Sequence, residues 1–272
     1  RIANGRITSI QEGAHEVSIV SPRKIFENPG EQDWVISIKN LSYSYDGRTA
    51  LEGVTLDVNR GETMALMGDN GAGKSTLLML LMGFMKPNEG SVDVRGCSGR
   101  TSLISRHVGF LFQNPNHQVI ESTVGKDLLL APRNFGMEEI EVLDRLKVLL
   151  DDLGLSDLVD TSPYRLSLGE KRRLNFGSVD IYRPDIYLLD EPFIGQDESN
   201  VEMIMGMVNR RVGNGGTCIL ATHDPDLVNG HCDRVAFLEK GMLTYLGKPG
   251  KVFAQLEDAG LEWYLPSGWC GA

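Results

Sequence analysis

The alternation of hydrophobic and polar positions predicts a pair of half-buried strands in the stretch that begins at Val35. The run VISIKNLSYSY alternates with a period of two, and GVTLDV follows a turn at Asp46-Gly47. Further apolar runs, TMALMG, VGFLFQ, DIYLLD and TCILATH, predict additional strands along the chain. TMALMG is apolar throughout, which is typical of a strand buried on both faces.

Helical patterns separate these strands. STLLMLLMGF predicts a buried helix directly after TMALMG, and a second helix-like stretch covers about residues 201–212. Between Gln113 and about Pro184 the strand pattern stops, and apolar residues recur at helical spacing, namely Ile140, Leu143, Leu146, Leu150 and Leu153. Strands that alternate with helices predict an α/β fold with a mostly parallel sheet covered on both faces, interrupted by a helical section.

Composition and charge narrow the class of protein. The chain has 272 residues, of which 41% are hydrophobic and 24% charged, as in ordinary globular proteins. A formal net charge of −10 argues against non-specific binding to nucleic acid. The four cysteines form no C-x-x-C pair, which favours a reduced, cytosolic compartment without thiolate metal sites. The longest apolar run, residues 77–85, is far shorter than the roughly 20 residues that cross a bilayer.

A phosphate-binding loop is predicted at GDNGAGKST, residues 68–76, which matches G-x-x-x-x-G-K-[ST] between a strand and a helix. Its glycines let backbone amides turn inward around phosphate oxygens, and the helix that follows adds its N-terminal dipole. Lys74 can reach the β- and γ-phosphates, and the Ser75 hydroxyl can ligate Mg²⁺. The other residues expected to line the nucleotide are Gly68, Asp69, Asn70, Gly71, Ala72, Gly73 and Thr76. A glycine-rich turn that binds nothing is the weaker alternative, because the motif is complete and in its proper setting.

A pair of carboxylates is predicted at the end of a buried strand, in IYLLDEP. In open α/β sheets, ligands bind at the edge where the strands end. Asp190 is placed to hold Mg²⁺, directly or through water, and Glu191 to accept a proton from the attacking water. An acidic pair that merely ends a strand is common, but together with the phosphate loop the catalytic interpretation is favoured.

The ordered set of motifs resembles the ABC-type ATPases over roughly residues 35–255. LSLGEKRRL, at residues 166–174, stands where that family has its LSGGQ signature. Gln113 in FQNP matches the Q-loop, Asp197 in GQD the D-loop and His223 in LATHD the switch histidine. The resemblance implies a P-loop fold with a mostly parallel central sheet, an antiparallel β subdomain and an inserted α-helical subdomain at about residues 115–184. FQNPNHQV and TVGKDLLLAPRNFGM are most similar to the ATPases of energy-coupling factor importers, which take up vitamins or transition-metal ions.

The resemblance also implies roles for residues outside the phosphate loop. Gln113 is expected to touch Mg²⁺ or the attacking water, and His223 to hydrogen-bond the γ-phosphate. Tyr45 is expected to stack on adenine, with Tyr43 as the competing candidate and an ordinary strand aromatic as the alternative.

Three further residues are expected to act across a dimer interface. Ser167 and Gly169 of the signature would contact the γ-phosphate bound to the opposite domain, and Asp197 would work at the same interface. Two ATP molecules would then lie between two head-to-tail ABC domains, either as a homodimer or as an asymmetric or tandem pair.

The signature departs from the family pattern at two positions. Leu168 replaces a glycine, and Glu170 replaces a glutamine. Glu170 brings negative charge near a triphosphate, which is unfavourable unless Lys171, Arg172 or Arg173 offsets it. Tolerated drift and a weakened composite site in an asymmetric pair are equally compatible with these changes.

The opening RIANGRITSIQEG echoes a later segment. When Gly5 is aligned with Gly241, the apolar residues on both sides of the turn coincide, and Ile10 falls on Leu246. We therefore expect residues 1–13 to be the tail of a preceding ABC domain that lacks its first hairpin strand and adds no strand to the central sheet. An unrelated extension with a chance Asn4-Gly5 turn is the alternative. Residues 14–34 are expected to be a linker, residues 35–255 the ABC domain and residues 256–272 a C-terminal tail.

The motifs together predict an ATPase domain that uses ATP and Mg²⁺ to power an ABC importer. Its expected partners are a second ABC domain and membrane-spanning subunits, which would place it peripherally at the cytoplasmic face of the cell membrane. One alternative is a soluble ABC ATPase that remodels a protein assembly, of the iron–sulfur assembly or translation-factor type. A regulatory domain that binds ATP without hydrolysis is disfavoured by the presence of Glu191 and His223.

Overall fold

The central sheet of the computed structural model, which describes residues 2–3, 6–7 and 33–271, has six strands in the order β11-β10-β5-β9-β8-β7. Every neighbouring pair is parallel except β10 and β11. The strands are β5 (Thr63–Met67), β7 (Val108–Leu111), β8 (Ile186–Asp190), β9 (Thr217–Ala221), β10 (Arg234–Glu239) and β11 (Met242–Gly247). All residues of β5, β7, β8 and β9 are buried, which confirms the interpretation of the continuous apolar runs.

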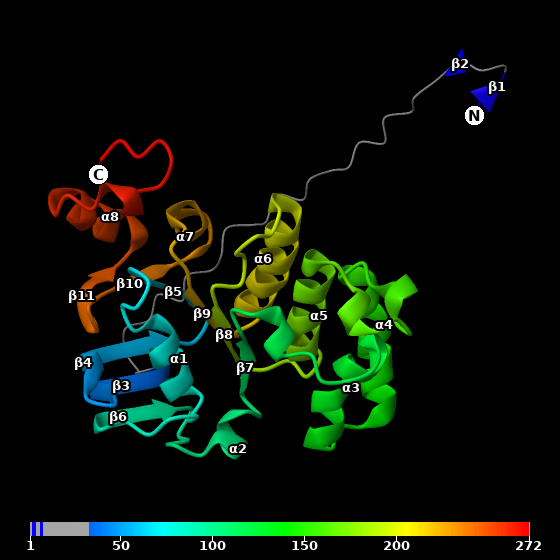
Figure 1. Ribbon diagram of the computed structural model, residues 1–272, viewed down its shortest axis with the longest axis horizontal. Helices are drawn as coiled ribbons and strands as arrows, with labels where there is room; N and C mark the ends of the chain where they lie inside the picture. Colours follow the sequence, from blue (N-terminus) through cyan, green and yellow to red (C-terminus); the bar gives the residue numbers. More distant parts are fainter. Residues whose placement is uncertain (1, 4–5, 8–32, 272) are drawn as a thin grey trace. The chain divides into compact units, whose positions relative to one another are not determined.

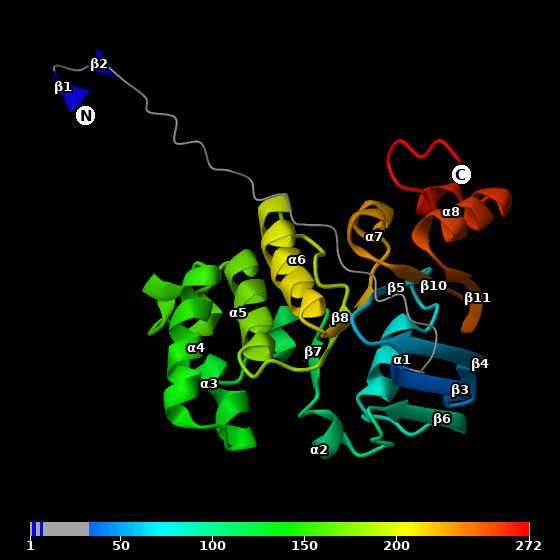
Figure 2. The ribbon, with the colours of Figure 1, turned by 180° about the vertical axis from the view of Figure 1, so that it is seen from behind.

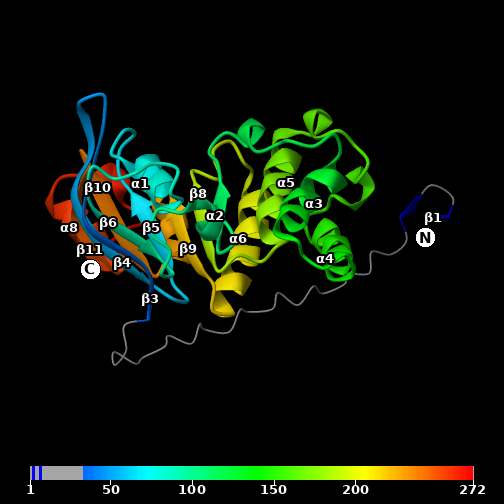
Figure 3. The same ribbon diagram turned by 90° about the horizontal axis from the view of Figure 1, so that it is seen from below.

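A second, antiparallel sheet has the order β4-β3-β6. It consists of β3 (Trp34–Tyr45), β4 (Arg48–Asn59) and β6 (Glu89–Val94). Alternate residues of β4 are buried toward its end, and these side chains share a core with helix α1 (Lys74–Leu81). Figure 3 shows these blue strands at the opposite end of this part of the chain from the green helices. The antiparallel β subdomain that the resemblance implied is therefore present.

The helical section lies beside β7, as Figure 1 shows in green. Its principal helices are α3 (Val124–Phe135), α4 (Glu139–Asp152) and α5 (Leu168–Asp180), with α2 (Thr101–Ile104) and the 3-10 turns η1 (Pro115–His117), η2 (Ser156–Leu158) and η3 (Pro163–Arg165) around them. The predicted apolar stripe of α4 is wrong at its start, because Ile140 and Leu143 are exposed. Val142 and Leu149 join the buried side instead, since the core lies on a neighbouring face of the helix.

The C-terminal third adds α6 (Glu198–Gly213), α7 (Pro225–His231), α8 (Pro249–Asp258) and η4 (Glu262–Tyr264). Figure 2 shows α7 and α8 side by side with β10 and β11. The expected boundary at residue 255 falls inside α8, and Leu256 beyond it is fully buried. The C-terminal tail therefore packs into the core of the domain.

The first residues form a small hairpin of their own, in which β1 (Ile2–Ala3) pairs with β2 (Arg6–Ile7). The expectation that the partner strand is missing is wrong for these residues, because Ile2 pairs with Ile7. The register matches that of β10 and β11, where Leu238 pairs with Leu243 around the later turn. Neither strand belongs to the six-stranded sheet, as expected. Most of the expected linker lies outside the described residues, and the assignment of residues 1–13 to a preceding domain stays a prediction.

Candidate active site

The loop between β5 and α1 is built from glycines whose backbone excludes other residues. Gly68, Gly71 and Gly73 have φ values of 138°, 84° and 105°, in the region that L side chains rarely adopt. A Cβ atom on Gly68 would lie 2.1 Å from the carbonyl oxygen of Leu238, and one on Gly73 would lie 2.6 Å from that of Ala50. The sequence predicted these glycines from their spacing, and the structure shows that two of them are also required by close packing.

Lys74, at the first turn of α1, is buried and holds the loop together. Its Nζ donates to the carbonyl oxygens of Gly68, at 2.7 Å, and of Asp69, at 3.2 Å. The same nitrogen lies 3.6 Å from Oε1 of Glu191. The lysine therefore stands between the glycine loop and the carboxylates at the end of β8, as the motif predicts.

The Ser75 hydroxyl donates to Oδ1 of Asp190 over 3.1 Å, which joins the start of α1 to the end of β8. Burial raises the pKa of the Asp190 carboxyl, while the hydrogen bond from Ser75 acts in the opposite direction and the charge of Glu191 raises it further. A hydroxyl and a carboxylate in this arrangement are the two protein groups that hold Mg²⁺ in P-loop NTPases.

Glu191 is the most constrained residue of the site. Its φ of 43° is unusual for a residue with a side chain, and its N–H donates to the carbonyl of Ala221 at 3.0 Å. Oε2 lies 3.0 Å from Nδ1 of His223, whereas the buried Oε1 has no hydrogen-bond partner among the described residues. This oxygen lies at ion-pair distance from Lys74 Nζ but accepts no hydrogen bond from any described residue, so it keeps the capacity to accept one from a bound water.

Tyr45, the residue expected to stack on adenine, lies at the edge of the same region. Tyr45 is 43% exposed, and its hydroxyl lies 3.5 Å from Oγ1 of Thr76 and donates to Sδ of Met85 at 3.2 Å. Tyr43 packs edge-on against Tyr45, with ring centroids 4.9 Å apart, and is less exposed. This geometry favours Tyr45 over Tyr43 as a stacking surface next to the phosphate loop.

The Q-loop is held by a residue whose function the sequence did not predict. Arg172 of α5 is 1% exposed, and its Nη1 and Nη2 donate to the carbonyls of Phe112, at 2.7 Å, and Gln113. Burial lowers the pKa of Arg172 to about 10, so it remains charged at neutral pH. The side chain of Gln113 itself is exposed. Arg172 thus ties the signature helix to the backbone of the Q-loop.

The signature begins α5 with a capping box. Ser167 Oγ accepts from the N–H of Glu170, and the Ser167 N–H donates to Oε2 of Glu170 at 2.8 Å. These hydrogen bonds hold the pKa of Glu170 below its usual range, with a small further contribution from Arg173. The negative charge of Glu170 is therefore stabilised mainly by the N–H and hydroxyl of Ser167, and not by the cationic residues predicted from the sequence. Leu168 is 52% exposed.

The D-loop contacts the signature through Asn200, a buried residue of α6. Arg173 Nη1 donates to Oδ1 of Asn200 at 2.7 Å, and the side-chain amide of Asn200 donates to Asp197 at 3.1 Å. A Cβ atom on Gly169 would lie 2.6 Å from Nδ2 of Asn200, which explains the glycine there by packing within this chain. Asp197 caps α6 and is exposed.

Apart from Tyr45 and Gln113, the predicted site residues therefore fall into two groups. Among the described residues, no hydrogen bond or ion pair connects the signature residues with those of the phosphate loop. The first group comprises the phosphate loop with Lys74, Ser75, Asp190, Glu191 and His223; the second comprises Ser167, Leu168, Gly169, Glu170 and Asp197.

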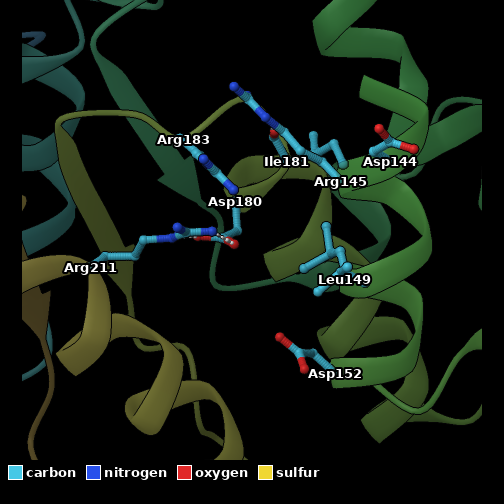
Figure 4. A pocket seen from close by; sticks show the side chains of 9 residues that line it. Asp144, Arg145, Leu149, Asp152, Asp180, Ile181, Arg183 and Arg211 are labelled. Atoms are coloured by element: carbon cyan, nitrogen blue, oxygen red, sulfur yellow. Dashed lines mark hydrogen bonds and ion pairs between the residues drawn. The ribbon is translucent and has the colours of Figure 1, made fainter. Parts of the chain in front are cut away.

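A separate pocket, shown in Figure 4, lies between α4, α5 and α6 and has a volume of about 260 Å³. Asp180, at its wall, accepts hydrogen bonds from Arg211 at 2.8 and 2.6 Å and from the Tyr187 hydroxyl at 2.7 Å. The carboxylate is thus fully engaged within the protein, and its charge raises the pKa of Arg211. We interpret the Asp180–Arg211 pair at this pocket as a structural ion pair that joins α5 to α6.

Comparison with known proteins agrees with this geometry. Residues 51–194 match the family model described as ABC transporter. The chain is 39% identical over 241 residues to the energy-coupling factor transporter ATP-binding protein EcfA2 of Streptococcus sanguinis, covering 82% of this chain and 84% of the relative. It is 36% identical to EcfA of Methanothermobacter thermautotrophicus, covering 82% and 74%. A solved structure of cbiO1 from Clostridium perfringens, described as part of the ABC transporter complex cbiONQ, is 31% identical with a TM-score of 0.73, covering 85% of this chain and 96% of that one.

The chain belongs to the ABC transporter ATP-binding family. It is an ATPase of the energy-coupling factor type, which hydrolyses ATP to energise import. The predicted fold, enzyme class and importer type are confirmed, and the soluble remodelling ATPase and the non-hydrolysing regulatory domain are set aside.

Proposed function

We propose that the phosphate loop binds ATP together with Mg²⁺, and that Ser75 and Asp190 are the protein ligands of the cation. The observation that carries this proposal is the Ser75–Asp190 hydrogen bond, which joins the phosphate loop to the end of β8 beside the Lys74–Glu191 ion pair. The described residues contain no cluster of three or more His, Cys, Asp or Glu side chains that could hold a metal by itself. This fits Mg²⁺, which uses one or two protein ligands and takes the rest from phosphate and water.

Each residue of the site has a role that its position supports. The loop amides and Lys74 bind the β- and γ-phosphates, and bound Mg²⁺ supplies charge neutralisation at the same oxygens. Glu191 orients and deprotonates the attacking water through Oε1, which accepts no hydrogen bond from the described residues. His223, paired with Oε2 of Glu191, holds that carboxylate and donates toward the γ-phosphate. Gln113 has an exposed side chain, and Arg172 holds its backbone carbonyl. Gln113 thereby couples movement of the helical section to the cation or the attacking water.

A second ABC domain completes the site in this proposal. Within the described part of the chain, the hydrogen bonds of Ser167 and Asp197 and the packing of Gly169 involve residues at the beginnings of α5 and α6. No hydrogen bond joins these three residues to the phosphate loop in that part of the chain. They act in trans, on nucleotide bound to the opposite domain. The partner is a second copy or a related domain in a head-to-tail pair.

We further propose that the domain works peripherally at the cytoplasmic face of a membrane, bound to spanning subunits. Within residues 33–271, the structure contains no helix with the length and hydropathy needed for a bilayer span. The relatives are named as energy-coupling factor transporter ATP-binding proteins, and the similar solved structure is described as part of an ABC transporter complex. Vitamins or transition-metal ions are the expected cargo class.

The decisive experiment measures ATP binding and phosphate release with and without Mg²⁺, on the chain alone and co-purified with its membrane subunits. Ser75→Ala and Asp190→Asn should abolish the Mg²⁺ dependence, whereas Ser102→Ala, at an exposed serine of α2, should not alter it. Equal Mg²⁺ dependence in all three variants would remove Ser75 and Asp190 from the cation site. Failure to co-purify with a multi-spanning protein would count against the membrane assignment.

A further inference from the structure

The C-terminal segment after α8 returns to the nucleotide site. Tyr264, in η4, is 4% exposed and packs edge-on against Phe237, with ring centroids 4.9 Å apart. The same core contains Met67, the last residue of β5 before the phosphate loop, and Phe253 of α8. The tail, to which the sequence assigned no function, is therefore packed beneath the start of the loop.

The Tyr264 hydroxyl donates to Oδ1 of Asp69, the second residue of the phosphate loop. The backbone carbonyl of Asp69 in turn accepts from Lys74 Nζ at 3.2 Å and from the N–H of Ala72 at 3.0 Å. Burial and the neighbouring Asp69 carboxylate raise the pKa of Tyr264, so its hydroxyl remains a donor throughout the physiological range. One hydrogen bond thus connects the tail to a residue that shapes the loop.

A second attachment lies three residues further along. The N–H and hydroxyl of Ser267 donate to the two carboxylate oxygens of Asp226, at 2.7 and 2.8 Å. Asp226 belongs to the first turn of α7, which begins just after His223. Trp269 completes the attachment, because its indole N–H donates to Glu257 of α8 at 2.9 Å.

We propose that Tyr264 is a positioning residue for the phosphate loop, and that residues 259–269 form a strut between this loop and the helix that follows the switch histidine. The hydrogen bond fixes the Asp69 carboxylate on the tail and partly compensates its charge. Without it, the carboxylate can turn toward the negative phosphates and oppose their binding. The inference rests on the proposed binding of ATP at this loop.

The test compares Tyr264→Phe with Tyr245→Phe in the full chain. Both tyrosines pack on Phe237, but only Tyr264 reaches the loop. Loss of one such hydrogen bond should weaken ATP binding by about 3- to 10-fold, measured by calorimetry, whereas Tyr245→Phe should leave affinity unchanged. Asp69→Asn in the Tyr264→Phe background should restore most of the affinity, because the neutral amide does not repel phosphate.

Thermal unfolding separates positioning from stability alone. A structural cap would lower the unfolding temperature of Tyr264→Phe without changing the ATP dissociation constant, and that result would overturn the inference. So would failure of Asp69→Asn to restore binding. If the unaltered chain does not bind ATP, the proposed function fails instead. Ser267→Ala provides a second, milder variant, and its ATP affinity should fall in the same direction as that of Tyr264→Phe.

Discussion

The two groups of site residues differ in burial. In the phosphate-loop group, Lys74, Asp190 and Glu191 are all less than a tenth exposed and lie within hydrogen-bond or ion-pair distance of one another or of Ser75. In the signature group, Ser167, Leu168 and Asp197 are all exposed. The first group is held by contacts within this chain, whereas the second presents side chains that another molecule can reach.

Arg172 joins the signature helix to the Q-loop. It is a buried guanidinium whose hydrogen bonds go to two backbone carbonyls of the Q-loop, and no ion pair with a carboxylate is found for it in the described residues. A buried charge without a counter-ion is costly, so the contact with the Q-loop must be maintained when the helix moves. On the function proposed above, we expect movement of the signature helix to be transmitted through this contact to Gln113.

The largest effect is expected when Glu191 of the phosphate-loop group is replaced. Glu191→Gln keeps the shape of the side chain but removes the base, so hydrolysis should fall by about 10²-fold or more while ATP binding persists. An ATP-bound dimer should accumulate, which size-exclusion chromatography with light scattering can detect. Glu198→Gln, at an exposed position of α6, is the matched control. Turnover at the normal rate in Glu191→Gln would remove this residue from the catalytic role.

The next largest effect is expected when the contact between Arg172 and the Q-loop is broken. Arg172→Met preserves most of the volume but cannot donate to the Q-loop, and kcat should fall by about 10-fold with little change in the KM for ATP. Arg172→Lys, which donates from a single point, should recover part of the activity. Lys171→Met is the control, because Lys171 donates to the exposed side chain of Asn116 and lies over the ring of Tyr164, but donates no hydrogen bond to the described Q-loop carbonyls. A rise in KM without a fall in kcat would contradict the connection.

A smaller effect sharpens the comparison within the signature. If the side chain of Leu168 weakens activation of the opposite site, Leu168→Gly should raise ATPase activity a few-fold in the assembled transporter complex. The isolated chain should change little, because this position acts on its partner. Loss of activity on introducing glycine would show that Leu168 packs productively, and the altered signature would then represent tolerated drift.

The smallest effect concerns charge. Glu170→Gln retains the capping box, since glutamine also bonds the N-cap, but removes a negative charge that would face the opposite nucleotide in the proposed head-to-tail pair. The KM for ATP in the complex should fall by about 2-fold, as for a solvent-screened charge. Because the folded-state pKa of Glu170 is lowered, its ionised capping interaction contributes stability above the usual glutamate range and loses it as pH falls through the lowered pKa. That acid-dependent loss should be absent in Glu170→Gln, as measured by thermal unfolding across pH.

Much of the site could be predicted because its chemistry is local. The glycine spacing, Lys74 and Ser75 lie on one strand–loop–helix unit, and Asp190 with Glu191 ends one apolar strand, so short-range patterns suffice. The positions of Arg172, Asn200 and Tyr264 could not be predicted in this way. Each acts on a residue far away in the sequence, for example Tyr264 on Asp69. The misplaced face of α4 has the same cause, since periodicity gives a stripe but not the direction of the core.

The sequence by itself therefore determined the buried strands β5, β7, β8 and β9, the phosphate loop and the order of the motifs, since these depend on residue type and spacing along the backbone. Tertiary structure alone decided that Glu191 sits at a positive φ between Lys74 and His223, and that Arg172 donates to the Q-loop instead of to Glu170. It also decided that the C-terminal tail contacts the phosphate loop. Such contacts arise from packing between elements more than 30 residues apart, where a single hydrogen bond is specified by the whole core and not by its neighbours in the chain.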